Sequence, residues 1–187
     1  LPLAGGDTTR GPATVITLQV LGACPADAVL RRSRARPGNQ VCVSGTLGDA
    51  AAGLAILEER WHPGPEAAGV LLERFNRPTA RLALGERLRG VATAAIDVSD
   101  GLLADLGHIA AASGVAIALD SAALPLAPAL AAAGERGRAW ALAGGDDYEL
   151  AFTLPAEAAL PEGCTRIGEV CKGTGLSVDG KAVDAGG

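Results

Sequence analysis

A short turn rich in oxygen-bearing side chains interrupts an apolar run near the middle of the chain. Residues 93–98 are typical of a strand, and apolar residues at helical spacing follow from Leu102. Asp97, Ser99 and Asp100 therefore lie at a predicted strand-to-helix turn. Two carboxylates so close repel each other unless a cation lies between them, and Mg²⁺ prefers such ligands together with phosphate oxygens. The pattern indicates either a magnesium site or a capped helix start beside a solvated loop acid.

Two glycine-rich segments also carry acids. Gly6 and Asp7 lie in a Gly-Gly-Asp-Thr-Thr run, where the backbone can approach a ligand closely and offer N–H groups to an anion and oxygens to a metal. The same residues also suit an ordinary turn. Asp146 begins a run of three carboxylates within four residues, directly before a predicted strand. This second run is either part of a site or a solvated surface loop.

Basic residues are concentrated in one stretch, with four arginines among residues 31–36, directly before a Pro-Gly turn that we interpret as a domain boundary. Arg31 either contacts a phosphate through its planar guanidinium or belongs to a solvated basic loop. A glycine-flanked helix start at residues 45–53 can also take a phosphate, although it lacks the lysine and hydroxyl of a P-loop.

Composition excludes several classes of protein. The 187 residues are 49% hydrophobic and 20% charged, typical of a globular chain long enough for one domain and part of another. A net charge of −5 without a basic, aromatic-rich tract argues against nucleic-acid binding, and no apolar stretch reaches the ~18 residues of a membrane span. The four cysteines lack Cys-x-x-Cys spacing, so we expect reduced, packed thiols. No signal peptide is visible, which predicts a cytoplasmic protein.

The order of the predicted elements indicates an α/β fold, in the form of an α+β mixed sheet with flanking helices. We expect a helix that begins within the glycine junction at residues 45–54 and continues to about residue 60. We expect further helices at residues 65–76, 79–90, 102–113 and 124–133, and a loop at 134–138. We expect strands at residues 13–22, 40–44, 93–98, 115–119 and 165–170, another directly after the acid run, and a hairpin over 176–183.

Five motifs, taken together and in this order, resemble the thiamine-monophosphate kinases, which belong to the aminoimidazole-ribonucleotide-synthetase-like (PurM-like) superfamily of ATP users. They lie at residues 5–11, 30–38, 45–54, 96–102 (Ile-Asp-Val-Ser-Asp-Gly-Leu) and 144–150 (Gly-Gly-Asp-Asp-Tyr-Glu-Leu). The resemblance runs along essentially the whole chain. It implies a homodimer of two-domain chains, in which residues 1–35 end the N-terminal ATP-binding and dimerisation domain and residues 36–187 form most of the C-terminal α/β domain.

The resemblance also implies an activity, the ATP-dependent phosphorylation of thiamine monophosphate to thiamine diphosphate by direct, Mg²⁺-assisted transfer. Carried over position by position, it assigns Mg²⁺ to Asp7, Asp97 and Asp100, and the nucleotide to Gly6, Asp7, Arg31 and Ser99. Asp146 stands where the family has a glutamate that contacts the thiamine substrate. We expect no covalent or general-base residue, because the attacking phosphate oxygen is already anionic.

Two other interpretations remain open at this point. The chain can belong to another ATP-using member of the superfamily, of the selenophosphate-synthetase or hydrogenase-maturation type, or it can be a non-catalytic nucleotide-binding or dimerisation module. The chain begins at Leu1, contains no methionine and ends abruptly, so we expect it to be a piece of a longer protein. The family's upstream acidic motifs and its C-terminal aromatic residue are absent from it, and we expect the isolated piece to be inactive.

Overall fold

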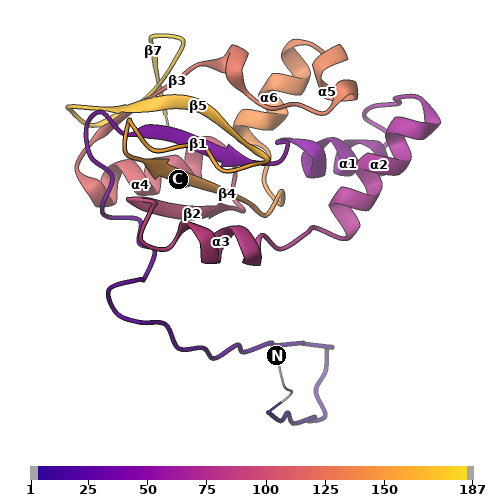
Figure 1. The fold of residues 1–187 in the computed structure, drawn as a ribbon. Coiled ribbons are helices and arrows are strands. Elements are labelled where there is room, and N and C mark those ends of the chain that lie inside the picture. Colours follow the sequence, from indigo (N-terminus) through magenta and orange to yellow (C-terminus); the bar gives the residue numbers. More distant parts are fainter. Residues whose placement is uncertain (1–3, 185–187) are drawn as a thin grey trace.

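A seven-stranded mixed sheet forms the centre of the molecule, in the strand order β2-β4-β1-β5-β3-β6-β7 (Figure 1). The computed structural model describes residues 4–184. Every neighbouring pair of strands is antiparallel except β3 and β6, which are parallel. The strands are β1 (Gln40–Ser44), β2 (Ala94–Val98), β3 (Ala116–Leu119), β4 (Glu149–Leu154), β5 (Cys164–Cys171), β6 (Gly175–Val178) and β7 (Lys181–Val183). The predicted mixed sheet with flanking helices is confirmed.

Helices cover both faces of this sheet. On one face α4 (Leu102–Ser113) and α6 (Glu135–Ala143) contribute to the main core, and on the other α3 (Leu82–Leu88) packs on β1 and β4 through a smaller core. Beside the sheet, α1 (Asp49–Leu57), α2 (Pro65–Asn76) and α5 (Pro128–Ala132) bury a third cluster with α6. A 3₁₀ turn, η1 (Ser121–Ala123), precedes α5.

The alternation of side chains along β2 places an acid on the α3 face. Ala94, Ile96 and Val98 point into the main core, where all three are buried. Successive strand residues point to opposite faces, so Asp97 points away from that core and is exposed. Its register partner on β4 is Leu150, which packs on the smaller core under α3.

Two of the predicted elements are wrong. Residues 13–22 form no strand, and Leu18 is 89% exposed, because the alternating pattern makes a strand only beside a hydrogen-bonding neighbour and none of the segments from 4 to 184 provides one. Residues 135–138, predicted as loop, begin α6. A Cβ on Gly137 would lie 2.0 Å from the carbonyl oxygen of Leu130, so this glycine serves the close packing of α6 on α5.

Other predicted elements are confirmed, some of them with shifted bounds. The structure shows β1 and α2 at the expected residues, and the hairpin of β6 and β7 turns at Asp179 and Gly180. The helix expected over 124–133 is shorter, because it begins at Pro128, whose fixed φ suits the first helical position. All four cysteines are free. Within the described part of the chain, we find no helix with the length and apolar character that a bilayer span requires.

Candidate functional site

Three glycine-containing loops meet at one end of the sheet. Strands β1 and β2 both pair antiparallel with β4, so they run in the same direction on either side of it. The carboxyl ends of β1 and β2 therefore lie beside the amino end of β4. These ends lead into the loops at residues 45–48 and 99–101, and the loop at residues 144–148 leads into β4. Strand pairing thus brings together motifs that are far apart in the sequence.

The two acid-rich loops are joined through their backbones. The amide of Asp146 donates to the carbonyl of Ser99 at 2.9 Å, and the amide of Tyr148 donates to the carbonyl of Val98 at 2.9 Å. Glycine permits this approach, because a Cβ on Gly145 would lie 2.4 Å from the Ser99 carbonyl oxygen. The predicted magnesium turn and the predicted substrate turn therefore form one rigid unit.

Residues 146–149 alternate between exposed and buried side chains. Asp147 is 2% exposed and Glu149 is fully buried, whereas Asp146 and Tyr148 are exposed. Asp146 and Tyr148 both have left-handed backbones, with φ of 65° and 51°. Such conformations are costly for residues with a Cβ and persist only where the surroundings enforce them. The surroundings here are the contacts of the two buried acids.

Asp147 holds the start of α1. Its carboxylate accepts from the amide of Gly48 at 2.6 Å and from the amide of Ala50 at 3.1 Å, two donors at the helix start that lack partners within the helix. Burial raises the pKa of Asp147 to about 6, although both hydrogen bonds lower it. A carboxylate in the β4 loop thus supplies the N-terminal cap that α1 lacks within its own sequence.

Glu149 is the centre of a buried ion-pair network. Its carboxylate accepts from Ser44 Oγ at 2.5 Å, from Arg74 Nη2 at 2.7 Å and from Arg81 Nε at 2.6 Å. Burial raises its pKa, but the hydrogen bonds from Arg81, Ser44 and Arg74 outweigh burial, so the pKa of Glu149 lies below its usual value. Arg74 also lies 3.4 Å from Asp49, a second buried carboxylate. The network joins β1, β4, α1, α2 and the residue that precedes α3.

The turn after β2 is held by a residue of the following helix. Asp105, 2% exposed, accepts from the amides of Ser99 and Asp100 at 3.0 and 3.1 Å. Burial raises the pKa of Asp105, against the effect of these two hydrogen bonds. The exposed carboxylates of Asp97 and Asp100 are left to face solvent, and a ligand atom of Asp100 lies within 4.8 Å of those of Asp105 and His108. The carboxylate oxygens of Asp97 and Asp100 are hard donors that suit Mg²⁺, whereas His108 offers a nitrogen.

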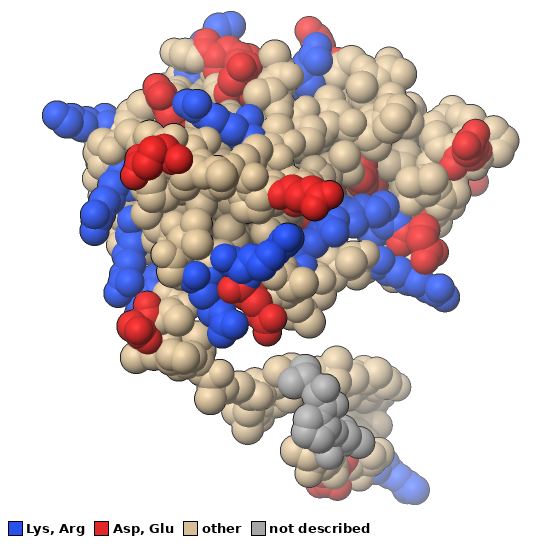
Figure 2. Space-filling model, viewed as in Figure 1, with Lys and Arg blue, Asp and Glu red and all other residues tan. Residues whose placement is uncertain are grey.

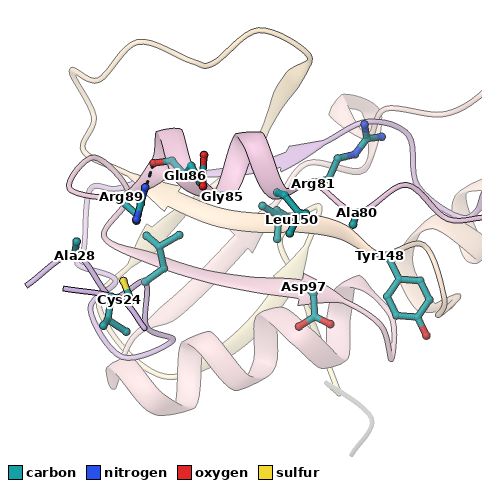
Figure 3. A pocket seen from close by; sticks show the side chains of 13 residues that line it. Cys24, Ala28, Ala80, Arg81, Gly85, Glu86, Arg89, Asp97, Tyr148 and Leu150 are labelled. Atoms are coloured by element: carbon teal, nitrogen blue, oxygen red, sulfur yellow. Dashed lines mark hydrogen bonds between the residues drawn. The ribbon is translucent and has the colours of Figure 1, made fainter. Parts of the chain in front are cut away.

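An apolar groove begins beside Asp97. It has a volume of about 490 Å³, within the roughly 300–1,000 Å³ range of small-molecule sites. Figure 3 shows Asp97 and Tyr148 toward one end, Arg81 and Leu150 next to them, and Cys24 and Ala28 at the other end. The wall between the two ends comes from α3, so the groove lies between α3, β2 and the segment that precedes β1.

The predicted site residues fall into two groups. Asp97, Ser99, Asp100 and Asp146 lie together at the joined loops. Gly6 and Asp7 lie in the exposed N-terminal segment, which extends away from the sheet (Figure 1), and the structure does not bring them to these loops. The side chain of Arg31 is exposed, and its carbonyl accepts from the amide of Ala95 at 3.0 Å, beside the start of β2.

The sequence analysis did not identify several residues of the site. Asp105 and His108 lie three residues apart on α4, a helical spacing that places both on one side and is the signal that was missed. Arg74 and Arg81 carried no such signal, because their partner Glu149 is 75 and 68 residues away. Figure 2 shows Lys and Arg in a band over α3 and the connection leading to it from α2. Within that region Arg81 turns inward to pair with Glu149.

Comparison with known proteins agrees with this geometry. Residues 36–181 match the family described as AIR synthase related protein, C-terminal domain. The thiamine-monophosphate kinase of Salmonella typhimurium is 50% identical over 158 residues, 83% of this chain and 48% of the relative. The thiamine-monophosphate kinase of Aquifex aeolicus is 39% identical over 190 residues, 97% of this chain and 60% of the relative. The chain thus spans about half the length of the curated relatives it matches.

Solved structures give the same result. A thiamine-monophosphate kinase from Stenotrophomonas maltophilia K279a superposes with a TM-score of 0.77 at 45% identity, covering 83% of this chain and 54% of that one. AaThiL complexed with AMPPCP and TMP superposes with a TM-score of 0.76 at 42% identity, covering 83% and 52%. E. coli HypE, a hydrogenase maturation protein, shares the fold with a TM-score of 0.66 at 24% identity. The chain belongs to the family of AIR synthase related proteins, of which it contains the C-terminal domain.

Proposed function

We propose that this chain is part of a thiamine-monophosphate kinase, which transfers the γ-phosphoryl group of ATP to thiamine monophosphate and forms thiamine diphosphate. One observation carries the proposal. The joined acid turns at residues 97–100 and 146–149 reproduce, at one end of one sheet, the motifs of a family in which relatives reach 50% identity. The complex of AaThiL with AMPPCP and TMP supports the same pair of ligands.

The residues of this chain then have separate roles in the reaction. Asp97 and Asp100 would hold Mg²⁺ beside the phosphates, together with Asp7, and Ser99 would contact the nucleotide. Mg²⁺, when bound, offsets the negative charge of the two phosphates that must approach each other. A phosphate oxygen of the acceptor attacks the γ-phosphorus in line while the bond to the β-phosphate oxygen breaks, and no side chain needs to take a proton.

The remaining assignments concern regions outside the joined loops. Gly6, Asp7 and Arg31 would contact the nucleotide once the N-terminal segment folds against the site. Asp146 would contact the acceptor, with a side chain one methylene shorter than the family's glutamate. In the proposed protein, residues 1–35 end an N-terminal ATP-binding and dimerisation domain, residues 36–187 belong to the C-terminal domain, and the protein is a cytoplasmic homodimer. The isolated 187-residue chain would be inactive.

A hydrogenase-maturation role is the second candidate, since HypE shares the fold. The kinase is favoured because HypE is 24% identical whereas kinase structures reach 45%. A non-catalytic nucleotide-binding module is the third candidate. It predicts that ATP and Mg²⁺ raise the thermal stability of the protein while no product forms.

The test uses the full-length protein with ATP, Mg²⁺ and thiamine monophosphate, and measures thiamine diphosphate. We expect product with the wild type and a loss of at least about 100-fold in kcat for Asp97→Asn, because charge stabilisation at the transferred phosphoryl group supplies much of the catalysis. Glu157→Gln is the control, an exposed acid beyond the other end of β4. Absence of product with ATP bound refutes the kinase, and equal losses in both variants refute the role of Asp97.

A further inference from the structure

We propose that Tyr148 is a binding residue for the acceptor, and that its ring face receives the cationic thiazolium ring. This inference rests on the proposed kinase function and names the part of the substrate that the exposed half of the second acid turn recognises. It adds to that turn an aromatic contact beside Asp146.

Tyr148 differs from the other aromatic residues of the chain. The chain has five, and all of them lie between residues 4 and 184. Trp61 and Trp140 pack against each other with ring centroids 4.9 Å apart, and Phe152 is fully buried in the smaller core. Tyr148 is 42% exposed, and among these five it alone is exposed to this degree. An aromatic ring left in solvent beside a groove is a feature that packing does not explain.

The structure holds this ring outward. Its neighbours Asp147 and Glu149 are anchored in the interior, by the amides at the start of α1 and by two arginines respectively. The backbone of Tyr148 is left-handed, with φ of 51°, and its amide is bonded to the carbonyl of Val98. These contacts hold the backbone that carries the ring, and Asp146 accepts from the hydroxyl at 3.2 Å, which reduces the entropy that binding must remove.

The surroundings of the ring are negatively charged. The hydroxyl of Tyr148 donates to Asp146 Oδ1 at 3.2 Å, and Tyr148 lines the groove together with Asp97 (Figure 3). The hydrogen bond to Asp146 raises the pKa of Tyr148, and the charges of Asp146, Asp97 and Asp100 raise it further. Arg81 is the cation nearest in the same wall, and its charge is already paired with Glu149. The end of the groove thus combines an aromatic ring with the exposed carboxylates of Asp97 and Asp146.

That combination selects a cationic ring. A cation within about 6 Å of an aromatic ring is attracted by the negative face of the ring, and the Asp146 carboxylate at the edge of this ring adds to the attraction. The thiazolium of thiamine monophosphate carries a permanent positive charge, is flat, and is joined by a short linker to the phosphate that must reach the Mg²⁺ held by Asp97 and Asp100. The adenine ring of ATP is neutral and would gain nothing from these acids. The apolar wall formed by Leu82 and Leu150 continues from this end of the groove.

The test measures affinity for two acceptors that differ in charge alone. Isothermal titration of the full-length protein, with AMPPCP and Mg²⁺ present, gives the Kd of thiamine monophosphate and of its neutral isostere, in which a thiophene ring replaces the thiazolium. We expect Tyr148→Leu to weaken the cationic acceptor about fivefold to thirtyfold. The same variant should weaken the neutral isostere less than about twofold. Tyr148→Phe keeps the ring face and should stay close to the wild type for both acceptors.

A second series does not depend on how the leucine variant folds. Phenylalanine, 4-fluorophenylalanine and 3,4,5-trifluorophenylalanine at position 148 keep nearly the same shape while the negative potential of the ring face decreases. The affinity for thiamine monophosphate should fall stepwise along this series, whereas the affinities for the neutral isostere and for AMPPCP should not change. The unchanged AMPPCP affinity shows that the nucleotide site is intact.

The outcomes separate the two proposals. If the wild type binds neither acceptor, the kinase function fails and this inference fails with it. If the wild type binds and phosphorylates thiamine monophosphate but the fluorinated series shows no trend, the kinase stands and the role of Tyr148 is refuted. Equal losses for the cationic and the neutral acceptor in Tyr148→Leu also refute it, because a packing contact does not distinguish charge.

Discussion

Replacement of Glu149 by glutamine tests the buried network most directly. The change keeps the size of the side chain and removes the one negative charge that Arg74 and Arg81 share. Glutamine also presents an amide N–H₂ where a carboxylate oxygen accepted from several donors. Because the site of the carboxylate is fully buried, water cannot replace the lost interactions.

The size of the effect follows from how far the partners are exposed. Removal of one partner of a fully buried pair costs about 3–5 kcal/mol. The side chains of Arg74 and Arg81 are 19% and 30% exposed, so solvent compensates part of their loss. We expect the free energy of unfolding to fall by about 2–4 kcal/mol, which lowers the Tm by roughly 5–15 °C.

Urea unfolding followed by tryptophan fluorescence measures this loss, because Trp61 and Trp140 pack in the helical cluster next to α2. The matched control is Glu58→Gln, which removes an exposed pair with Arg60 and should cost below about 1 kcal/mol. The hydrogen bonds hold the pKa of Glu149 below its usual value, so its stabilisation is present above the pKa of the unfolded chain. It is lost as the pH falls through the folded pKa. The difference between wild type and variant should therefore shrink in acid.

A loss of less than about 1 kcal/mol, or a loss equal to that of Glu58→Gln, would refute the reasoning. So would a difference that stays constant down to pH 2. Either result would mean that the arginines find other partners when the carboxylate is removed, and that the network adds little to the packing of the helices on the sheet.

The remaining predictions concern the joined loops. Gly145→Ala should lower both stability and activity, because its Cβ would lie 2.4 Å from the Ser99 carbonyl oxygen. The control is Gly69→Ala on α2, which has open space around it and should stabilise the protein by about 0.5–1 kcal/mol. Thermal unfolding and turnover compare the two variants. Asp147→Asn should change the pH dependence of stability. Burial raises the folded pKa of Asp147 to about 6, so the wild type loses stability as the pH rises from about 4 through 6, and the variant should lack this component in urea titrations across that range. An identical pH profile for both proteins would contradict the assignment.

Local sequence patterns predicted much of the fold. Helix α2 was predicted with its observed bounds, because it begins at Pro65 directly after Gly64 and ends before the Arg77-Pro78 pair. The alternation in residues 13–22 led to a wrong strand prediction, because periodicity describes a single segment whereas a strand needs a second segment beside it to form hydrogen bonds. The start of α6 was missed because Gly137, which is unfavourable in a helix, is explained by its close contact with Leu130 of α5, and this contact depends on how the two helices pack.

The candidate site divides in the same way. Asp97, Ser99, Asp100 and Asp146 stood out because their acids and hydroxyl occur at glycine-rich turns. The residues that hold these turns did not stand out, because the partners of Asp147 and Glu149 lie 68 to 105 residues away. Chemically active residues in one turn can be identified from the sequence, whereas the distant residues that orient their side chains are known only once the sheet topology is known.

The alternation along residues 146–149 bears on how such a site can evolve. Asp147 and Glu149 secure the loop from within, whereas Asp146 and Tyr148 are exposed and, in the proposed function, contact the acceptor. A substitution at Asp146 or Tyr148 can therefore alter which molecule is accepted while the scaffold keeps its stability. A substitution at Asp147 or Glu149 removes contacts that hold the loop, so it lowers the stability of the scaffold and also disturbs the positions of Asp146 and Tyr148. Relatives with different acceptors can thus arise from one framework through changes at every second residue of a single turn.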